Sequence, residues 1–162
     1  MHNRPRLTLR SAAAVLTGTA MLTAAAACGD GSVPVSVPTE FGAAAVCREL
    51  AWPVSLGELV ARKTSPSDPA IAAWGDPPVI ARCGLAPLAP TTLECLSVNG
   101  IDWVIRPLDD GTAFATYGRD PAIEVLIPRA YAPEPMLLTD FTDVARSLPT
   151  TDRACVTRSP GP

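Results

Sequence analysis

Histidine is almost absent from this sequence, and this excludes several kinds of catalytic site. The chain of 162 residues contains one histidine, His2, and one lysine, Lys63. A Ser-His-Asp or Cys-His arrangement needs an imidazole base, so neither can form once the N-terminal segment that carries His2 is removed. Lys63 falls at the end of an expected exposed helix, which argues against a serine nucleophile with a lysine base.

The N-terminus has the pattern of a signal peptide. Arg4, Arg6 and Arg10 precede residues 11–27, which carry no charge. A positive region followed by an apolar region is typical of export signals. Seventeen residues are at the short limit for a bilayer-spanning helix, and the many alanines make the segment only weakly hydrophobic. We therefore expect residues 1–27 to be removed.

The cleavage site indicates a lipoprotein. Ala25, Ala26 and Ala27 stand directly before Cys28, and Gly29 follows. Small residues before a cysteine let the peptide enter a lipoprotein signal peptidase and let the thiol take a diacylglycerol. We expect lipidation of Cys28 and attachment to the outer face of the cytoplasmic membrane, because two acyl chains suffice for lasting anchoring. Ordinary cleavage after Ala27 and an uncleaved anchor are the alternatives.

The mature chain is acidic and long enough for one domain. Without residues 1–27, ten basic and sixteen acidic side chains are left, a formal charge of −6. This balance argues against nucleic acid as a partner. We expect residues 28–40 to form a lipidated tether with a reach of at most roughly 40 Å. A single domain over residues 41–157 and a flexible tail over residues 158–162 complete the expected organisation.

The other cysteines suit disulfides better than a metal. Lipidation of Cys28 leaves Cys47, Cys83, Cys95 and Cys155, an even number in an oxidising compartment. Three connectivities are possible, and we favour Cys83 with Cys95 and Cys47 with Cys155. The chain has no Cys-x-x-Cys spacing, so we expect no metal site and no cofactor.

The middle of the chain reads as antiparallel β-structure. Asn99-Gly100 is a hairpin turn between two β-rich runs, and if it has two residues Val98 faces Ile101 and Leu96 faces Trp103. Alternating apolar residues continue to Pro128, which predicts a four-stranded meander with residues 79–83 as a fifth strand. Helices are expected over residues 43–52, from Ser55 to before Pro66, and over residues 134–148. The predicted fold is α+β, with helices on one face of the sheet.

A few side chains are candidates for ligand binding. Trp74, Trp103 and Tyr117 could stack on a sugar ring, although the alternation around Trp103 favours a place in the core. Arg82 and Arg119 stand in stretches with few other charges and could bind an anion together. Ion pairs with Asp76, Asp102 or Asp120 are the simpler interpretation for the arginines.

Paired carboxylates could support glycoside chemistry without histidine. Four acids lie on or beside the expected meander: Asp102, Asp109, Asp110 and Asp120. Turn positions already explain two of them, because Asp110 precedes Gly111 and Asp120 precedes Pro121.

Three motifs together resemble a known family. They are WGDPPVIARCG at residues 74–84, VNGIDW at residues 98–103 and FATYGRDPAIEVLIP at residues 114–128. The chain from about residue 43 to residue 155 resembles a family of actinobacterial secreted proteins and lipoproteins, domain of unknown function 3515. This resemblance implies an envelope location and no established reaction, and it assigns no catalytic residues.

The sequence therefore predicts a non-catalytic lipoprotein that binds another envelope component. A small-ligand or glycan-binding module that uses Trp74, Arg82, Trp103 or Arg119 is the alternative. A histidine-free acid/base hydrolase is the third interpretation.

Overall fold

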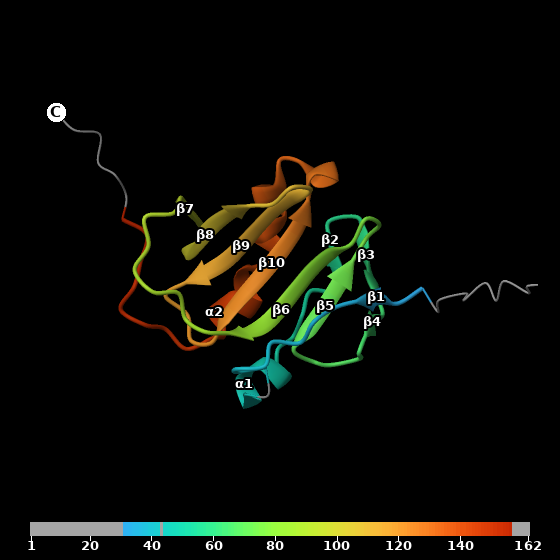
Figure 1. The fold of residues 1–162 in the computed structure, drawn as a ribbon, viewed down its shortest axis with the longest axis horizontal. Helices are drawn as coiled ribbons and strands as arrows, with labels where there is room; N and C mark the ends of the chain where they lie inside the picture. Colours follow the sequence, from blue (N-terminus) through green and yellow to red (C-terminus); the bar gives the residue numbers. More distant parts are fainter. Residues whose placement is uncertain (1–30, 43, 157–162) are drawn as a thin grey trace, which may run out of the picture.

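The computed structural model describes residues 31–42 and 44–156. The expected signal peptide, the lipidation site Cys28 and the tail over residues 158–162 lie outside them. Eight strands form the main sheet: β2 (Ser55–Leu56), β3 (Leu59–Arg62), β5 (Ile71–Trp74), β6 (Val79–Leu85), β7 (Cys95–Val98), β8 (Ile101–Pro107), β9 (Gly111–Tyr117) and β10 (Ala122–Pro128). Their order is β2-β3-β5-β6-β10-β9-β8-β7, and every pairing is antiparallel (Figure 1). The predicted sheet of four to five strands was too small.

The predicted meander is the part of the sheet that local sequence specifies best. Strands β7 to β10 are neighbours in chain order, and Val98 faces Ile101 as expected. Asn99 and Gly100 have φ angles of 52° and 79°. Positive φ at both central residues is the requirement of a type I′ turn, which explains the Asn-Gly pair.

The helix predicted from Ser55 is wrong, because this segment is the β2–β3 hairpin. Leu56 pairs with Leu59 across a turn in which Gly57 has φ of 54°. Residues three apart share a face of a helix, but they also face each other across a two-residue turn. The spacing of apolar residues therefore fits both structures, and the buried side chain of Leu56 is held by the core as part of a strand.

Helices are shorter than predicted, and the domain is mostly sheet. The first is α1 (Ala45–Arg48), which ends well before Trp52. The chain bends at Glu49, and Trp52 packs against Trp74 with 6.4 Å between ring centroids, so tertiary contact overrides helix propensity here. The C-terminal segment contains the 3₁₀ helices η1 (Arg129–Tyr131) and η2 (Glu134–Phe141) and the helix α2 (Thr142–Arg146). Within the described residues, no helix is long and apolar enough to cross a membrane.

The core lies between one face of the sheet and the C-terminal helical segment (Figure 1). Trp74, Trp103 and Phe114 supply the largest buried side chains of the sheet, and Phe141 is the largest from the helical segment. Trp74 and Phe141 meet edge to face at 5.5 Å, an arrangement that adds about 1 kcal/mol to the burial of the rings.

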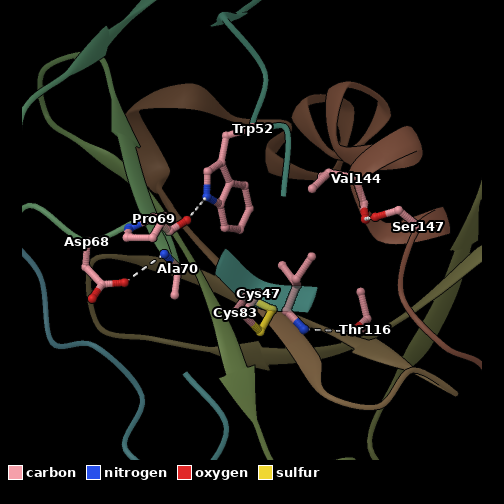
Figure 2. Close-up of a disulfide and its surroundings, with 10 residues drawn as sticks. Cys47, Trp52, Asp68, Pro69, Ala70, Cys83, Thr116, Val144 and Ser147 are labelled. Atoms are coloured by element: carbon pink, nitrogen blue, oxygen red, sulfur yellow. Dashed lines mark hydrogen bonds between the residues drawn. A yellow bond between two sulfur atoms is a disulfide. The ribbon is translucent and has the colours of Figure 1, made fainter. Parts of the chain in front are cut away.

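Both disulfides form, but with a connectivity different from the favoured one. Cys47 on α1 is bonded to Cys83 on β6 (Figure 2), and Cys95 on β7 is bonded to Cys155 in the C-terminal segment. The favoured Cys83–Cys95 bridge is wrong because β10, β9 and β8 lie between β6 and β7. Four strand spacings amount to about 19 Å, whereas a disulfide requires Cα atoms within about 7 Å.

The segment expected to be a tether is packed on the domain from Val33 onward. Strand β1 (Val33–Pro34) pairs in parallel with β4 (Thr64–Ser65), and the side chains of Val33 and Val35 are buried against Ile71 and Ala73. Farther along, the amide of Phe41 donates to the carbonyl of Gly84 at 3.2 Å. Gly84 has φ of 110°, and a side chain there would collide with the backbone of Gly42.

We expect the two disulfides to differ in their effect on stability. Loop entropy alone predicts about 4 kcal/mol for each bridge. Cys47 and Cys83 are fully buried in the core, so replacing both with alanine also leaves a cavity. Cys95 and Cys155 are only partly buried. Urea unfolding followed by tryptophan fluorescence should give a larger loss for C47A/C83A than for C95A/C155A, and the reverse order would contradict this assignment of the core.

Candidate functional site

The sheet has a second face, opposite the core, that carries a cluster of charged side chains. We call it the outer face. Side chains alternate along a strand, so burial of Val125 in the core places Glu124 on the outer face. Glu124 on β10 lies directly opposite Arg82 on β6. Arg106 on β8 reaches the same carboxylate from two strands away.

Arg82, Glu124 and Arg106 form a network that we call the outer-face triad. Arg82 donates from Nε at 2.8 Å and from Nη2 at 2.6 Å to Oε2 of Glu124. Arg106 donates from Nη2 to Oε1 at 2.8 Å. The side chain of Glu124 is 5% exposed, whereas those of Arg82 and Arg106 are 27% and 52% exposed. A buried carboxylate therefore holds two guanidinium groups that reach solvent.

Small residues on β9 make the contact between Arg106 and Glu124 possible, which reaches across this strand. Ala113 pairs with Arg106 on one side and with Leu126 on the other, while Ala115 pairs with Glu124. Arg106 thus stands one row of side chains away from Glu124, and the intervening alanines leave room for its aliphatic stem. A long arginine side chain commonly covers apolar surface while its charged end stays accessible.

Two hollows flank the triad along β6 and β10. The apolar hollow, of about 350 Å³, is formed by Pro77, Pro78, Ile80, Leu108, Leu126 and Pro128, and Asp110 also lines it. The second hollow, of about 530 Å³, lies over Arg82 and Gly84 and is bounded by residues 38–40. Its lining is mixed, and we call it the polar hollow because the charged residues Arg82 and Glu40 line it. Ile80 pairs with Leu126 in the row next to Arg82 and Glu124. The triad therefore lies between the apolar hollow and the polar hollow.

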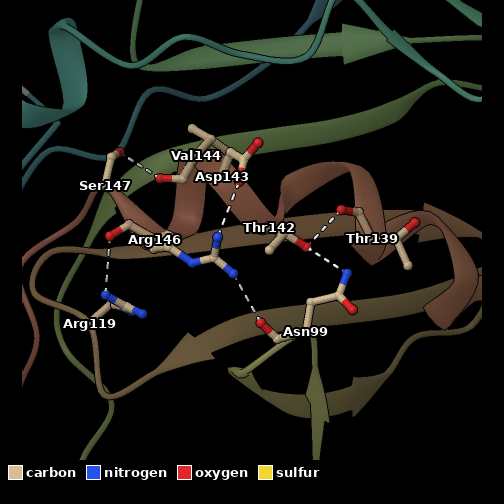
Figure 3. A network of polar contacts seen from close by, with 8 residues as sticks. All are labelled: Asn99, Arg119, Thr139, Thr142, Asp143, Val144, Arg146 and Ser147. Carbon is tan, nitrogen blue, oxygen red and sulfur yellow. Dashed lines mark hydrogen bonds and ion pairs between the residues drawn. The ribbon is translucent and has the colours of Figure 1, made fainter.

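Arg119, the second predicted anion ligand, has a different set of partners. Its Nη1 donates to the carbonyls of Leu148 at 2.9 Å and Arg146 at 3.4 Å, near the C-terminus of α2 (Figure 3). A cation at this position stabilises the helix dipole. Burial and the nearby charge of Arg146 lower the pKa of Arg119, and Asp102 opposes this effect. Arg82 is engaged by Glu124 instead, so the two arginines take separate structural roles.

The tryptophans proposed as sugar-stacking residues are core residues. Trp74 and Trp103 are 1% and 0% exposed, so neither ring presents a face to a ligand in the folded domain. The indole Nε1 of Trp74 donates to the carbonyl of Pro53 at 3.0 Å. In the described part of the chain, Nε1 of Trp103 is the only buried side-chain polar atom without a partner.

The candidate acids are spread over the domain. Asp102 accepts the amide of Cys155 at 2.7 Å and so fastens the C-terminal segment. Asp110 lines the apolar hollow. Across residues 31–42 and 44–156, no group of three or more metal-ligating side chains was found.

Sequence reasoning identified Arg82 but missed its partners. Glu124 is the only charged residue within the strand AIEVLIP, where it alternates with apolar core positions. Arg106 occupies the corresponding alternate position after Asp102 and Val104. A lone acid inside a buried strand is the signal that could have pointed to Glu124, because buried charges are normally paired.

Removal of the central carboxylate should destabilise the fold more than removal of one arginine. Glu124→Gln leaves two guanidinium groups together without their counter-charge, and we expect a loss of about 2 kcal/mol or more in the free energy of unfolding. Arg106→Gln should cost less than about 1 kcal/mol, because its side chain is half exposed. Urea unfolding of both variants checks this, and equal losses would show that Glu124 does not organise the triad.

Comparisons with known proteins give the family but no activity. A search of curated proteins and a search of solved structures each found no match. A family model described as Protein of unknown function (DUF3515) matches residues 7–152. Because the match covers most of the chain, this protein belongs to the DUF3515 family.

Proposed function

We propose that this protein is an exported lipoprotein, anchored through Cys28 on the outer face of the cytoplasmic membrane, whose domain binds another envelope component. The single observation that carries this proposal is the pairing of Cys47, Cys83, Cys95 and Cys155 in two disulfides. Stable disulfides are typical of proteins outside the reducing cytoplasm. The sequence supplies the anchor, because Cys28 follows three alanines at the end of an apolar segment.

Binding suits the outer-face triad better than catalysis does. Arginine stays protonated at ordinary pH and does not act as a general acid or base. Glu124 is already held by two guanidinium groups. The groups that reach solvent can recognise a ligand by hydrogen bonds and charge, and they supply no proton relay. We therefore propose a non-catalytic role, with the outer face as the binding surface.

Intact-mass analysis of the protein extracted from its native membrane tests the anchor and the disulfides together. We expect a chain that begins at Cys28 with a diacylglycerol-sized increment. Reduction should add four hydrogen atoms, two for each of the two disulfides. A species that begins elsewhere and carries no lipid would contradict the lipoprotein assignment, and free thiols in the native protein would contradict the disulfides.

A pair of variants separates anchoring from folding. Cys28→Ala should abolish the lipid increment and release the protein from the membrane fraction. C95A/C155A is the matched control, since it also replaces cysteines and should keep the lipid and the membrane location. Membrane retention of a Cys28→Ala product that has lost residues 1–27 would show that another segment anchors the chain.

A further inference from the structure

We infer that the outer-face triad binds the carboxylate of an acidic peptide segment, and that an apolar side chain two residues away occupies the apolar hollow. The inference rests on the proposed binding role of this face and names the ligand chemistry. It is carried by three features of the described residues: charge, the arrangement of donors and the distance from the triad to the hollow.

The charge of the triad favours one added anion. Two guanidinium groups around one carboxylate leave a net charge of +1 at Arg82, Glu124 and Arg106. Each guanidinium has five N–H donors. Within the described residues, Arg82 directs two of its nitrogens to Glu124 and Arg106 directs one. Donors are therefore left over on both groups, and both side chains reach solvent.

The donors are held in place before a ligand arrives. Glu124 is almost fully buried and fixes both guanidinium groups by short hydrogen bonds. Planar guanidinium groups match the geometry of a carboxylate, which can accept two parallel N–H bonds. Because the arginine side chains are already ordered, binding costs less conformational entropy than it would for free arginines.

The apolar hollow lies at a distance that suits an extended peptide. Ile80 and Leu126 are two residues along β6 and β10 from Arg82 and Glu124, on the same face. Two residues along a strand correspond to about 7 Å. Alternate side chains of an extended ligand lie on one side at the same spacing, so a carboxylate over the triad places the side chain two positions away over Ile80 and Leu126.

Acidic residues at both ends disfavour surfaces with many anions. Asp110 lines the apolar hollow and Glu40 lines the polar hollow. An anionic lipid surface or another polyanion would meet these carboxylates as well as the triad. A ligand with a single carboxylate and an apolar group brings no second negative charge to Asp110 or Glu40. This is why a peptide is the favoured ligand.

A matched set of peptides tests the charge and the spacing. The probe is fluorescently labelled leucyl-alanyl-glutamyl amide, titrated with the full-length protein in detergent and followed by fluorescence anisotropy. Its glutaminyl counterpart has the same shape without the charge and should bind about tenfold more weakly, the loss expected for a charged hydrogen bond. Leucyl-glutamyl-alanyl amide puts the two side chains on opposite sides and should also lose affinity. Equal binding of all three peptides, or binding of none, would overturn the inference.

Two variants place the binding on the outer face. Arg106→Gln should weaken binding of the glutamyl peptide by about tenfold, while Arg48→Gln, on α1, should stay within about twofold of the native protein. Near-ultraviolet circular dichroism checks that both variants are folded. Equal affinities of the two variants would overturn the assignment to Arg106.

Competition experiments separate the peptide from other anions. Inorganic phosphate and phosphatidylglycerol vesicles are added to the preformed complex. Persistence of the anisotropy supports a peptide site, whereas displacement by vesicles would overturn it in favour of a lipid, and displacement by phosphate alone would show a site for any anion. The mass measurement of the native protein is independent of peptide binding. If the peptide does not bind but a lipid is found on Cys28, this inference fails while the proposed membrane location stands.

Discussion

Burial of one face of β6 and β10 is the constraint on which the rest of the structure depends. On β6, three fully buried residues alternate with Ile80 and Arg82: Val79, Ala81 and Cys83. A shift of one residue in register would exchange the two faces of the strand. The same packing that forms the core therefore fixes Arg82 on the opposite face, across from Glu124. The register between β6 and β10 therefore determines both the core and the candidate site.

Local patterns made part of this structure predictable. The Asn99-Gly100 turn specifies its own geometry, and strict alternation specifies which side chains of β8 face the core. The residues that pack on one side of the final segment were also largely recognised, because Phe141, Val144 and Leu148 are buried as expected. Each of these features depends on neighbours close in sequence.

Features that depend on distant neighbours were not predictable. The spacing of Leu56 and Leu59 fits a helix or a hairpin, and only the core decides between them. The disulfide partners of Cys83 and Cys95 depend on β10 pairing with β6, which places three strands between these cysteines. Sequence alone identified Arg82 as a candidate, but its counter-charge lies 42 residues away on another strand. Long-range pairing of this kind leaves no periodic signal.

Docking of the N-terminal segment on the domain limits how far the domain could stand from the lipid anchor proposed at Cys28. Val33 is already part of β1, and Cys28 is five residues before it in the sequence. A fully extended chain spans at most about 3.6 Å per residue, so a lipid on Cys28 would hold β1 within about 18 Å of the Cα atom of that lipidated cysteine. In the proposed lipoprotein the domain then works at the bilayer surface itself. Its partners would be molecules that come close to the membrane surface.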